Sequence, residues 1–323
     1  MVEPLYAFER KLRGAAAHLG CSPAEDSVVA ACVETANEIA GRIDSDLSPS
    51  ERLDALADHY SVSLEVVTTT ASLDATVERY ARAGELGFLT RRQRFDADLI
   101  AAILRRRFVE EGQRRFVAMI DAREHRRAMA FHSKAHEVAH PALEPQLDLD
   151  FREEISKRDP WESFVDRVAS EMVFAGRPWT SSVGQVLGSS GYIELSAVRN
   201  LRETMVPEAS TTAIAIAAAG SLSRAALILW CCPEVSKRDP VPTLRVLQVT
   251  PSRAAFASAT FIHRKCRVPD SSPIFAAWQS GQSRSGLEDI GTWVGRPGQM
   301  GWTSAIPAAG RGVQAVINFA DTR

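Results

Sequence analysis

The chain has 323 residues, of which 45% are hydrophobic and 24% are charged, and its formal net charge is −2. This composition is typical of a soluble globular protein with room for two or three domains, and it excludes a disordered chain or one whose overall charge attracts a polyanion. No run approaches the roughly 18 apolar residues of a membrane span, and the N-terminal segment carries charges where a secretory signal has its apolar core. We therefore expect a cytoplasmic protein without a membrane partner.

The N-terminal part of the chain alternates helical patterns with short extended runs. Ser22 before Pro23 is a good N-cap followed by a first-turn proline, and it separates two helical patterns. A capped helix and then a valine-rich run follow. We expect helices over Pro4–His18, Ala24–Ile43, Ser48 or Ser50–Tyr60 and Ala71–Ala83, and strands over Ser63–Thr69 and Phe116–Ile120.

An arginine-rich segment lies between Gly87 and Arg127. It holds eleven arginines against six acids, a local excess of five positive charges. Such an excess is compatible with DNA binding, which is carried mainly by charge. Solvated helix faces are the favoured interpretation, because the acids are interleaved with the arginines. Direct DNA binding through this segment is the alternative.

The stretch FHSKAHEVAH contains the pattern HExxH, formed by His136, Glu137 and His140. Residues four apart lie one turn above each other on a helix, so the two histidines project to one side like two ligands of a tetrahedral metal. Glu137 is placed to reach the water on that metal as general acid/base. The pattern predicts a Zn²⁺ site that hydrolyses a peptide bond, and a chance match of three residues is the competing interpretation.

Two neighbours of the pattern affect its interpretation. Pro141 directly follows His140 and biases it away from helical backbone angles, so we expect the helix to end on its second ligand. His132 lies one turn before His136 on the same stripe. It is a site residue, a partner of the ligands or a core histidine, and the last two are favoured.

The third metal ligand is expected on a helix over Pro160–Phe174, which begins after the N-cap Asp159. At 100° per residue, Asp166 and Glu162 share one face with apolar neighbours, whereas Glu171 points away. We rank Asp166 first, Glu162 second and Glu171 third. The competing interpretation is an N-terminal carboxylate stabilised by the helix macrodipole, and it suits Glu162 better than Asp166.

Three segments together resemble the ImmA/IrrE metallopeptidases: REHRRAMAFHSKAHEVAH, the helix and strand LDALADHYSVSLEVV, and the later helix DRVASEMVFAGRP. The likeness covers residues 48 to 180. In that family the later helix carries an acid, two variable residues and Ala-Asn, and the acid is the third zinc ligand. The matching residue is Asp166, with Asp in place of the usual Glu and Ser170 in place of the Asn. The resemblance implies that the substrate is a transcriptional repressor of the helix-turn-helix type. Its cleavage would switch on a stress, DNA-damage or mobile-element response.

Beyond residue 180 the character of the chain changes. The segment LSAVRNLRETMVPEASTTAIAIAAAG is similar to the helix-turn-helix-like unit that follows the peptidase core in the family. Its part AIAIAAAG is too apolar to read DNA bases and is expected to pack. Residues 225–323 hold short apolar runs between Pro, Gly and Ser clusters, which predicts strands. In placement and size this part resembles a GAF-like sensor domain, which implies a small-molecule signal. Four aromatics there are candidates for a ligand pocket, although a core role is favoured: Phe261, Trp278, Trp293 and Trp302.

We therefore expect an α+β fold with a mainly helical zincin-like peptidase core and a small sheet, a helical linker unit and a strand-rich C-terminal domain. The expected divisions are an N-terminal helical extension (1–45), the metallopeptidase-like domain (46–180), the linker (181–224) and the sensor-like domain (225–323). The leading function is a zinc-dependent endopeptidase. The alternative from another class is a regulatory protein with an inactive peptidase fold that acts by binding a partner or DNA. The five cysteines, odd in number and without CxxC spacing, predict buried free thiols.

Overall fold

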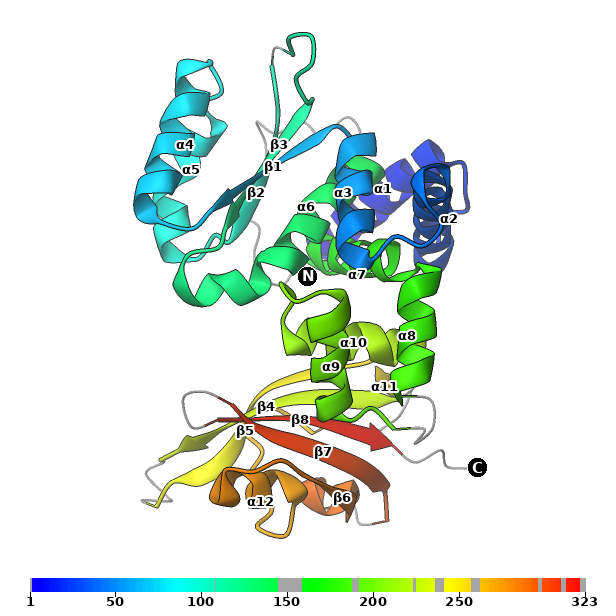
Figure 1. Cartoon of the computed structure of the whole chain (residues 1–323), viewed down its shortest axis with the longest axis vertical. Coiled ribbons are helices and arrows are strands. Elements are labelled where there is room, and N and C mark those ends of the chain that lie inside the picture. Colours follow the sequence, from blue (N-terminus) through cyan, green and yellow to red (C-terminus); the bar gives the residue numbers. More distant parts are fainter. Residues whose placement is uncertain are drawn as a thin grey trace. The chain divides into compact units, whose positions relative to one another are not determined.

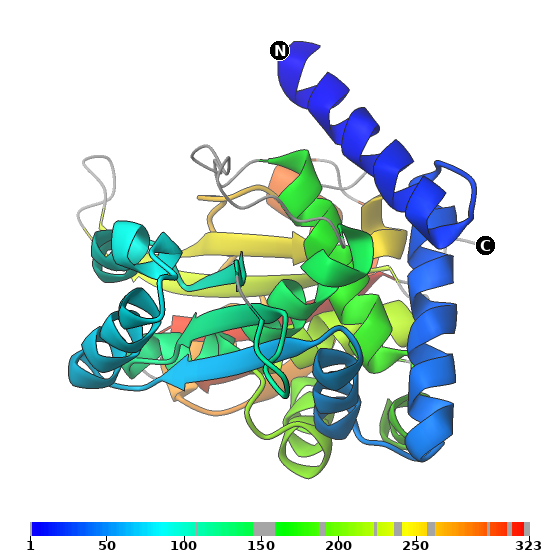
Figure 2. The ribbon, with the colours of Figure 1, turned by 90° about the horizontal axis from the view of Figure 1, so that it is seen from above.

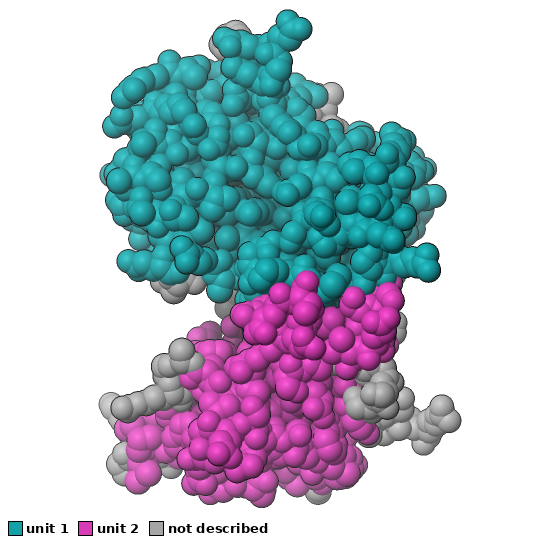
Figure 3. Space-filling model, viewed as in Figure 1, with its two compact units in different colours: residues 1–179, 205–210 teal, residues 180–204, 211–323 magenta. Residues whose placement is uncertain are grey.

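The computed structural model describes residues 2–107, 109–144, 159–187, 192–222, 225–235, 241–256, 262–295, 298–308 and 312–319. These residues form helices and two β-sheets, so the predicted α+β class is confirmed (Figure 1). The chain divides into two compact units (Figure 3). Unit 1 comprises residues 1–179 and 205–210, and unit 2 comprises residues 180–204 and 211–323. No helix in the described ranges is long and apolar enough to cross a membrane.

The division between the units lies near residue 180, where the sequence predicts the end of the peptidase-like domain. The predicted N-terminal extension belongs to unit 1, and most of the predicted linker belongs to unit 2. Neither short segment stands as a body of its own. A segment of about 45 residues rarely buries enough apolar surface to be stable alone, so its helices pack on a larger neighbour.

Unit 1 contains a three-stranded sheet in the order β1-β3-β2. Strands β1 (Val62–Val67) and β3 (Phe116–Asp121) are parallel, and β2 (Ala101–Arg105) is antiparallel to β3. All six residues of β3 are buried. Because side chains alternate along a strand, burial of every residue means that both faces of the central strand are covered.

Helices cover the two faces of this sheet. On one face α4 (Thr70–Arg82) and α5 (Gly87–Ala97) form a core with Val117 and Met119 of β3. The neighbouring residues of β3 point to the opposite face, where α6 (Ala130–Leu143) packs against all three strands (Figure 1). The sheet is therefore the platform on which the helix with the HExxH pattern lies.

Helix α6 does not end at its second histidine. It continues through Pro141 to Leu143, so the predicted end at His140 is wrong. A proline has no backbone N–H, and its ring crowds the carbonyl four residues earlier. Because Pro141 lies so near the end of α6, the helix loses only one backbone hydrogen bond. Burial of Leu143 and the bond from the Glu144 N–H to the His140 carbonyl (2.7 Å) hold the last turn in place.

The remaining helices of unit 1 lie beside α6. They are α1 (Val2–Leu19), α2 (Glu25–Ile43), α3 (Pro49–His59) and α7 (Pro160–Phe174), and α1 leads obliquely into α2 at one side of the unit (Figure 2). Arg52 of α3 is buried, and its Nε donates to the Met172 carbonyl (2.6 Å) while Nη2 donates to Asn37 (2.7 Å). These bonds fix α7 against α2 and α3.

The short 3₁₀ helix η1 (Glu124–Met129) leads into α6 and is held by a buried carboxylate. Asp121, fully buried at the end of β3, accepts hydrogen bonds from Arg123 and Arg126. Burial alone would raise the pKa of Asp121, but these hydrogen bonds lower it. Arg126 also donates to carbonyls at the end of α5. Arg123 and Arg126 of the arginine-rich segment therefore form hydrogen bonds within unit 1 and do not contribute to a broad basic surface.

We expect Asp121→Ala to destabilise the protein by about 3 kcal/mol or more. The substitution removes the carboxylate shared by Arg123 and Arg126, whose side chains are largely buried. Asp58→Ala is the matched control, since its ion pair with Arg114 is exposed and such pairs contribute about 1 kcal/mol or less. Urea unfolding of the metal-free chain measures both. Equal losses in the two variants would show that the Asp121 network does not anchor η1.

Unit 2 is built on a five-stranded antiparallel sheet in the order β5-β4-β8-β7-β6. The strands are β4 (Ala226–Glu234), β5 (Thr243–Pro251), β6 (Arg284–Asp289), β7 (Met300–Ala308) and β8 (Gly312–Phe319). One of the short apolar runs expected to form strands, GTWVG at residues 291–295, instead lies in the 3₁₀ helix η3 (Ile290–Val294). Strand β6 was not predicted, because as an exposed edge strand it has no apolar run.

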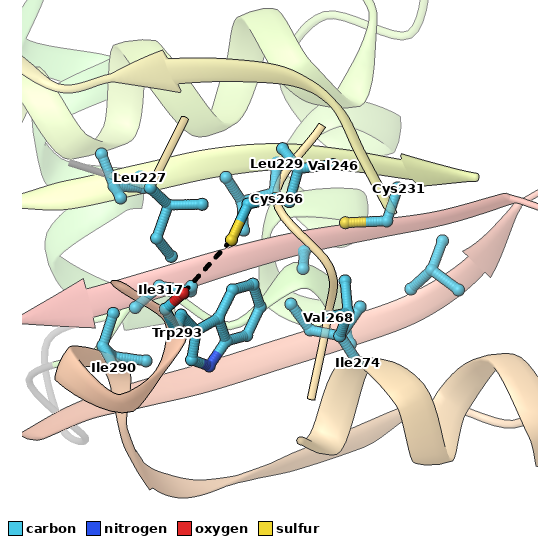
Figure 4. Close-up of a cluster of buried hydrophobic side chains, with 14 of the residues drawn as sticks. Leu227, Leu229, Cys231, Val246, Cys266, Val268, Ile274, Ile290, Trp293 and Ile317 are labelled. Atoms are coloured by element: carbon cyan, nitrogen blue, oxygen red, sulfur yellow. Dashed lines mark hydrogen bonds between the residues drawn. The ribbon is translucent and has the colours of Figure 1, made fainter. Parts of the chain in front are cut away.

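One face of this sheet carries an apolar core under α11 (Arg253–Phe256), α12 (Pro273–Ser280) and η3 (Figure 4). The core includes Trp293 and two cysteines, and the thiol of Cys266 donates to the Trp293 carbonyl (3.5 Å). Burial raises the pKa of the Cys231 thiol. All five cysteines are free, as predicted, but only three of them are buried. Trp293 lies in this core and Trp278 packs against it, which is the role favoured for them. Phe261 lies outside the described residues.

The other face of the sheet is more polar. Helices α9 (Leu195–Met205) and α10 (Thr211–Ser221) and the segment before α9 pack against it. Asn318 exchanges hydrogen bonds with the backbone of Ile193, and Gln314 donates to Thr212. Most of the apolar residues of α10 are buried, so the prediction that AIAIAAAG packs is confirmed. Helix α8 (Arg177–Leu187) precedes this part of the chain.

Candidate metal centre

Helix α6 brings the three residues of the HExxH pattern to one site. The ring of His140 is fully buried, the side chain of His136 is 16% exposed, and Glu137 is buried. The rings of His136 and His140 lie 4.8 Å apart, as expected for residues one turn apart. The sequence pattern therefore predicts the local geometry of α6 correctly.

The Nε2 atoms of both histidines converge on one carboxylate of α7. Nε2 of His136 lies 3.1 Å from Nε2 of His140 and 3.0 Å from Oε2 of Glu162, and His140 Nε2 lies 3.5 Å from the same oxygen. Ligands of a tetrahedral zinc, about 2.0–2.1 Å from the metal, are separated by about 3.3 Å. The three atoms thus have the mutual spacing of a metal site, and they form such a group within the described chain.

Asp166, ranked first in the sequence analysis, lies on the opposite side of the His136 ring. Its Oδ1 is 2.6 Å from Nδ1 of His136 and 3.0 Å from Nε2 of His132. Of the two carboxylates, the structure therefore brings Glu162, not Asp166, into the convergent group. Glu171 is not in that group either. His132 joins the site as a partner of Asp166, one of the two favoured interpretations.

Glu137 has the burial expected of a residue that acts on a bound water. The side chain is 4% exposed, and its Oε2 has no hydrogen-bond partner among the described residues. A buried carboxylate oxygen without a partner is energetically unfavourable unless something polar or charged occupies the site. Two imidazoles, one carboxylate and a further carboxylate beside them are a donor set that fits Zn²⁺ with one position left for water.

The carboxylates around His136 control its charge. Burial acts to lower the pKa of His136, but hydrogen bonds with Asp166 and Glu162 and the charge of Glu137 raise it to about 10. In the same way burial acts to raise the pKa of Asp166, but His132 and His136 hold it well below its ordinary value. Without metal, His136 is therefore an imidazolium at neutral pH, and metal binding has to displace its proton.

We expect zinc binding at pH 8 to release about one proton from His136, because this is below its pKa of about 10. The affinity then rises with pH and levels off as pH passes that value. Calorimetric titrations in buffers with different ionisation enthalpies measure the released proton. Zinc binding with the same enthalpy in all buffers would contradict this protonation state.

Comparisons with known proteins add nothing to this geometry. A scan against protein-family models finds no match for the chain, and a search of curated proteins finds none. The interpretation of the site depends on the arrangement of its own residues.

One further carboxylate at the site was not predicted from the sequence. Oε2 of Glu144 lies 3.7 Å from Nδ1 of His140. Its spacing of four residues from His140, on the same helix face, is a signal that was present in the sequence. Each histidine of the group therefore presents Nε2 to the convergent site and Nδ1 to a carboxylate.

Proposed function

We propose that this chain is a zinc-dependent endopeptidase in which His136, His140 and Glu162 hold Zn²⁺ and Glu137 is the general acid/base. The observation that carries this proposal is the convergence of the two Nε2 atoms and Oε2 of Glu162 beside a buried, unpartnered carboxylate oxygen. Three protein ligands with an open fourth position are the arrangement of catalytic zinc sites, whereas structural sites are closed by four ligands.

The residues of the site have separate roles in the hydrolysis of a peptide bond. When bound, Zn²⁺ supplies a Lewis acid that lowers the pKa of a coordinated water to about 7 and polarises the scissile carbonyl. Glu137 accepts a proton from the water that attacks the carbonyl, and it passes a proton to the nitrogen of the leaving amine. Asp166 holds the proton on Nδ1 of His136, which leaves Nε2 with its lone pair toward the convergent site.

The resemblance to the ImmA/IrrE metallopeptidases supports the class of substrate within this proposal. The substrate would be a helix-turn-helix repressor whose cleavage switches on a stress, DNA-damage or mobile-element response. Unit 2 would serve as the GAF-like part that receives a small-molecule signal. Its five-stranded sheet with helices on both faces supports that role, and the layout of unit 1, helices on a small sheet, supports a zincin-like core.

Metal analysis of the purified full chain tests the proposal. We expect one zinc per chain, lost in His136→Ala, and zinc-dependent cleavage of a candidate repressor. An inactive regulatory protein would bind the same repressor without cutting it. Absence of zinc from the wild-type chain after loading and dialysis would exclude the metallopeptidase.

A further inference from the structure

Helix α1 contacts both helices that carry the candidate ligands, α6 and α7. Phe8 packs edge-on against the rings of Trp161 and Phe164, with centroids 6.3 and 6.0 Å apart. The Nζ atom of Lys11 lies 5.2 Å from the centre of the Trp161 ring. These contacts lie in the first two turns of α7, and Trp161 and Phe164 flank Glu162 in the sequence.

Lys11 also reaches the end of α6. Its Nζ lies 3.6 Å from Oε1 of Glu144, whose other oxygen faces Nδ1 of His140 at 3.7 Å. The side chains of Lys11 and Glu144 are 34% and 23% exposed. Because this exposure is partial, solvent screens the ion pair less than it screens a pair on the open surface.

The position of Glu144 matters for the metal-binding nitrogen of His140. Nε2 of His140 faces the convergent group, so Nδ1 must carry the proton for His140 to be a neutral ligand. A carboxylate behind Nδ1 favours that tautomer and fixes the ring orientation. Lys11 opposes rotation of the Glu144 side chain away from the ring, because rotation would break the ion pair.

We propose that Lys11 is a positioning residue of the metal centre, which acts through Glu144 on His140. Helix α1 is then a working part of the site, although its sequence lies far from the HExxH pattern. This inference rests on the proposed zinc site. It deepens that proposal by extending the support of the ligands to a helix outside α6 and α7.

A double-mutant cycle in the full chain tests the inference. We expect Glu144→Gln to raise the zinc Kd about tenfold, within the range seen for residues behind a metal ligand, and Lys11→Met to raise it about threefold. In the Glu144→Gln background, Lys11→Met should have no further effect, because its route to His140 is already broken. Lys11→Arg keeps the charge and should restore the wild-type Kd.

Chelator competition gives the Kd values, and the visible spectrum of the Co²⁺-loaded protein reports ligand geometry. Arg13→Met is the control, since Arg13 is exposed on the same helix. An equal rise in Kd from Lys11→Met in both backgrounds would overturn the route through Glu144. So would a lowered unfolding midpoint with unchanged Kd and Co²⁺ spectrum, which would show a structural role only. Zinc bound equally by all variants overturns this inference alone, whereas no zinc in the wild type overturns it together with the proposed function.

Discussion

Glu137→Gln is expected to abolish peptide cleavage while one zinc stays bound. Glutamine keeps the size of the side chain but accepts no proton, and general acid–base catalysis contributes about 10²–10⁴-fold to a rate. Folding should be little affected, because the Oε2 atom that changes has no hydrogen-bond partner in the described structure. Measurement of kcat/KM together with the zinc content separates lost chemistry from lost metal.

Glu171→Gln is the matched control for this variant, since Glu171 belongs to α7 but not to the convergent group. It should cleave at the wild-type rate. Full activity of Glu137→Gln would remove Glu137 from the mechanism, and loss of zinc in this variant would mean that the carboxylate is a ligand instead.

Substitutions of Glu162 and Asp166 are expected to weaken zinc binding to different extents. We expect Glu162→Ala to abolish stoichiometric zinc binding, because it removes one of three ligand atoms. Asp166→Asn should retain zinc with an affinity lower by about 10–100-fold, because the outer partner of a ligating histidine is weakened rather than a ligand lost. Zinc content after dialysis and the Kd measured by chelator competition report the two losses.

The opposite result for these two variants would identify Asp166 as the third ligand. If Asp166→Asn lost its zinc and Glu162→Ala kept it, the third ligand would be the acid that the family-like spacing indicates. The metal would then have to draw Asp166 away from the His136 Nδ1 atom and the His132 Nε2 atom that it contacts. His132→Ala would in that case leave zinc binding almost unchanged.

The sequence indicated the site only as far as local periodicity extends. His136, Glu137 and His140 follow from a pattern within one helix turn, and the structure gives them the expected geometry. Glu162 and Asp166 are four residues apart, so a helical projection places both on one face. It cannot tell which nitrogen of a ring on another helix each carboxylate reaches, because that depends on how far α7 is shifted along α6.

The fold shows the same limit. Helices with caps, such as α3 after Ser48, were predictable from short segments. Strand β6 and the helix η3 were not, because an edge strand lacks an apolar run and a short apolar run does not specify its backbone. The partnership of Asp121 with Arg123 and Arg126 was not predicted, because it depends on the burial of the end of β3.

The place of β8 in the sheet of unit 2 affects how this unit is made. Strand β8 is the last described strand in sequence, yet it lies between β4 and β7. During synthesis the hairpin of β4 and β5 leaves the ribosome early, but its inner edge stays unpaired until β8 has been translated. A message with a stop codon before residue 312 would therefore yield a unit 2 with an open sheet edge, a known cause of aggregation. Unit 1 contains all the residues of the proposed metal centre, so it would not lose any of them in such a product.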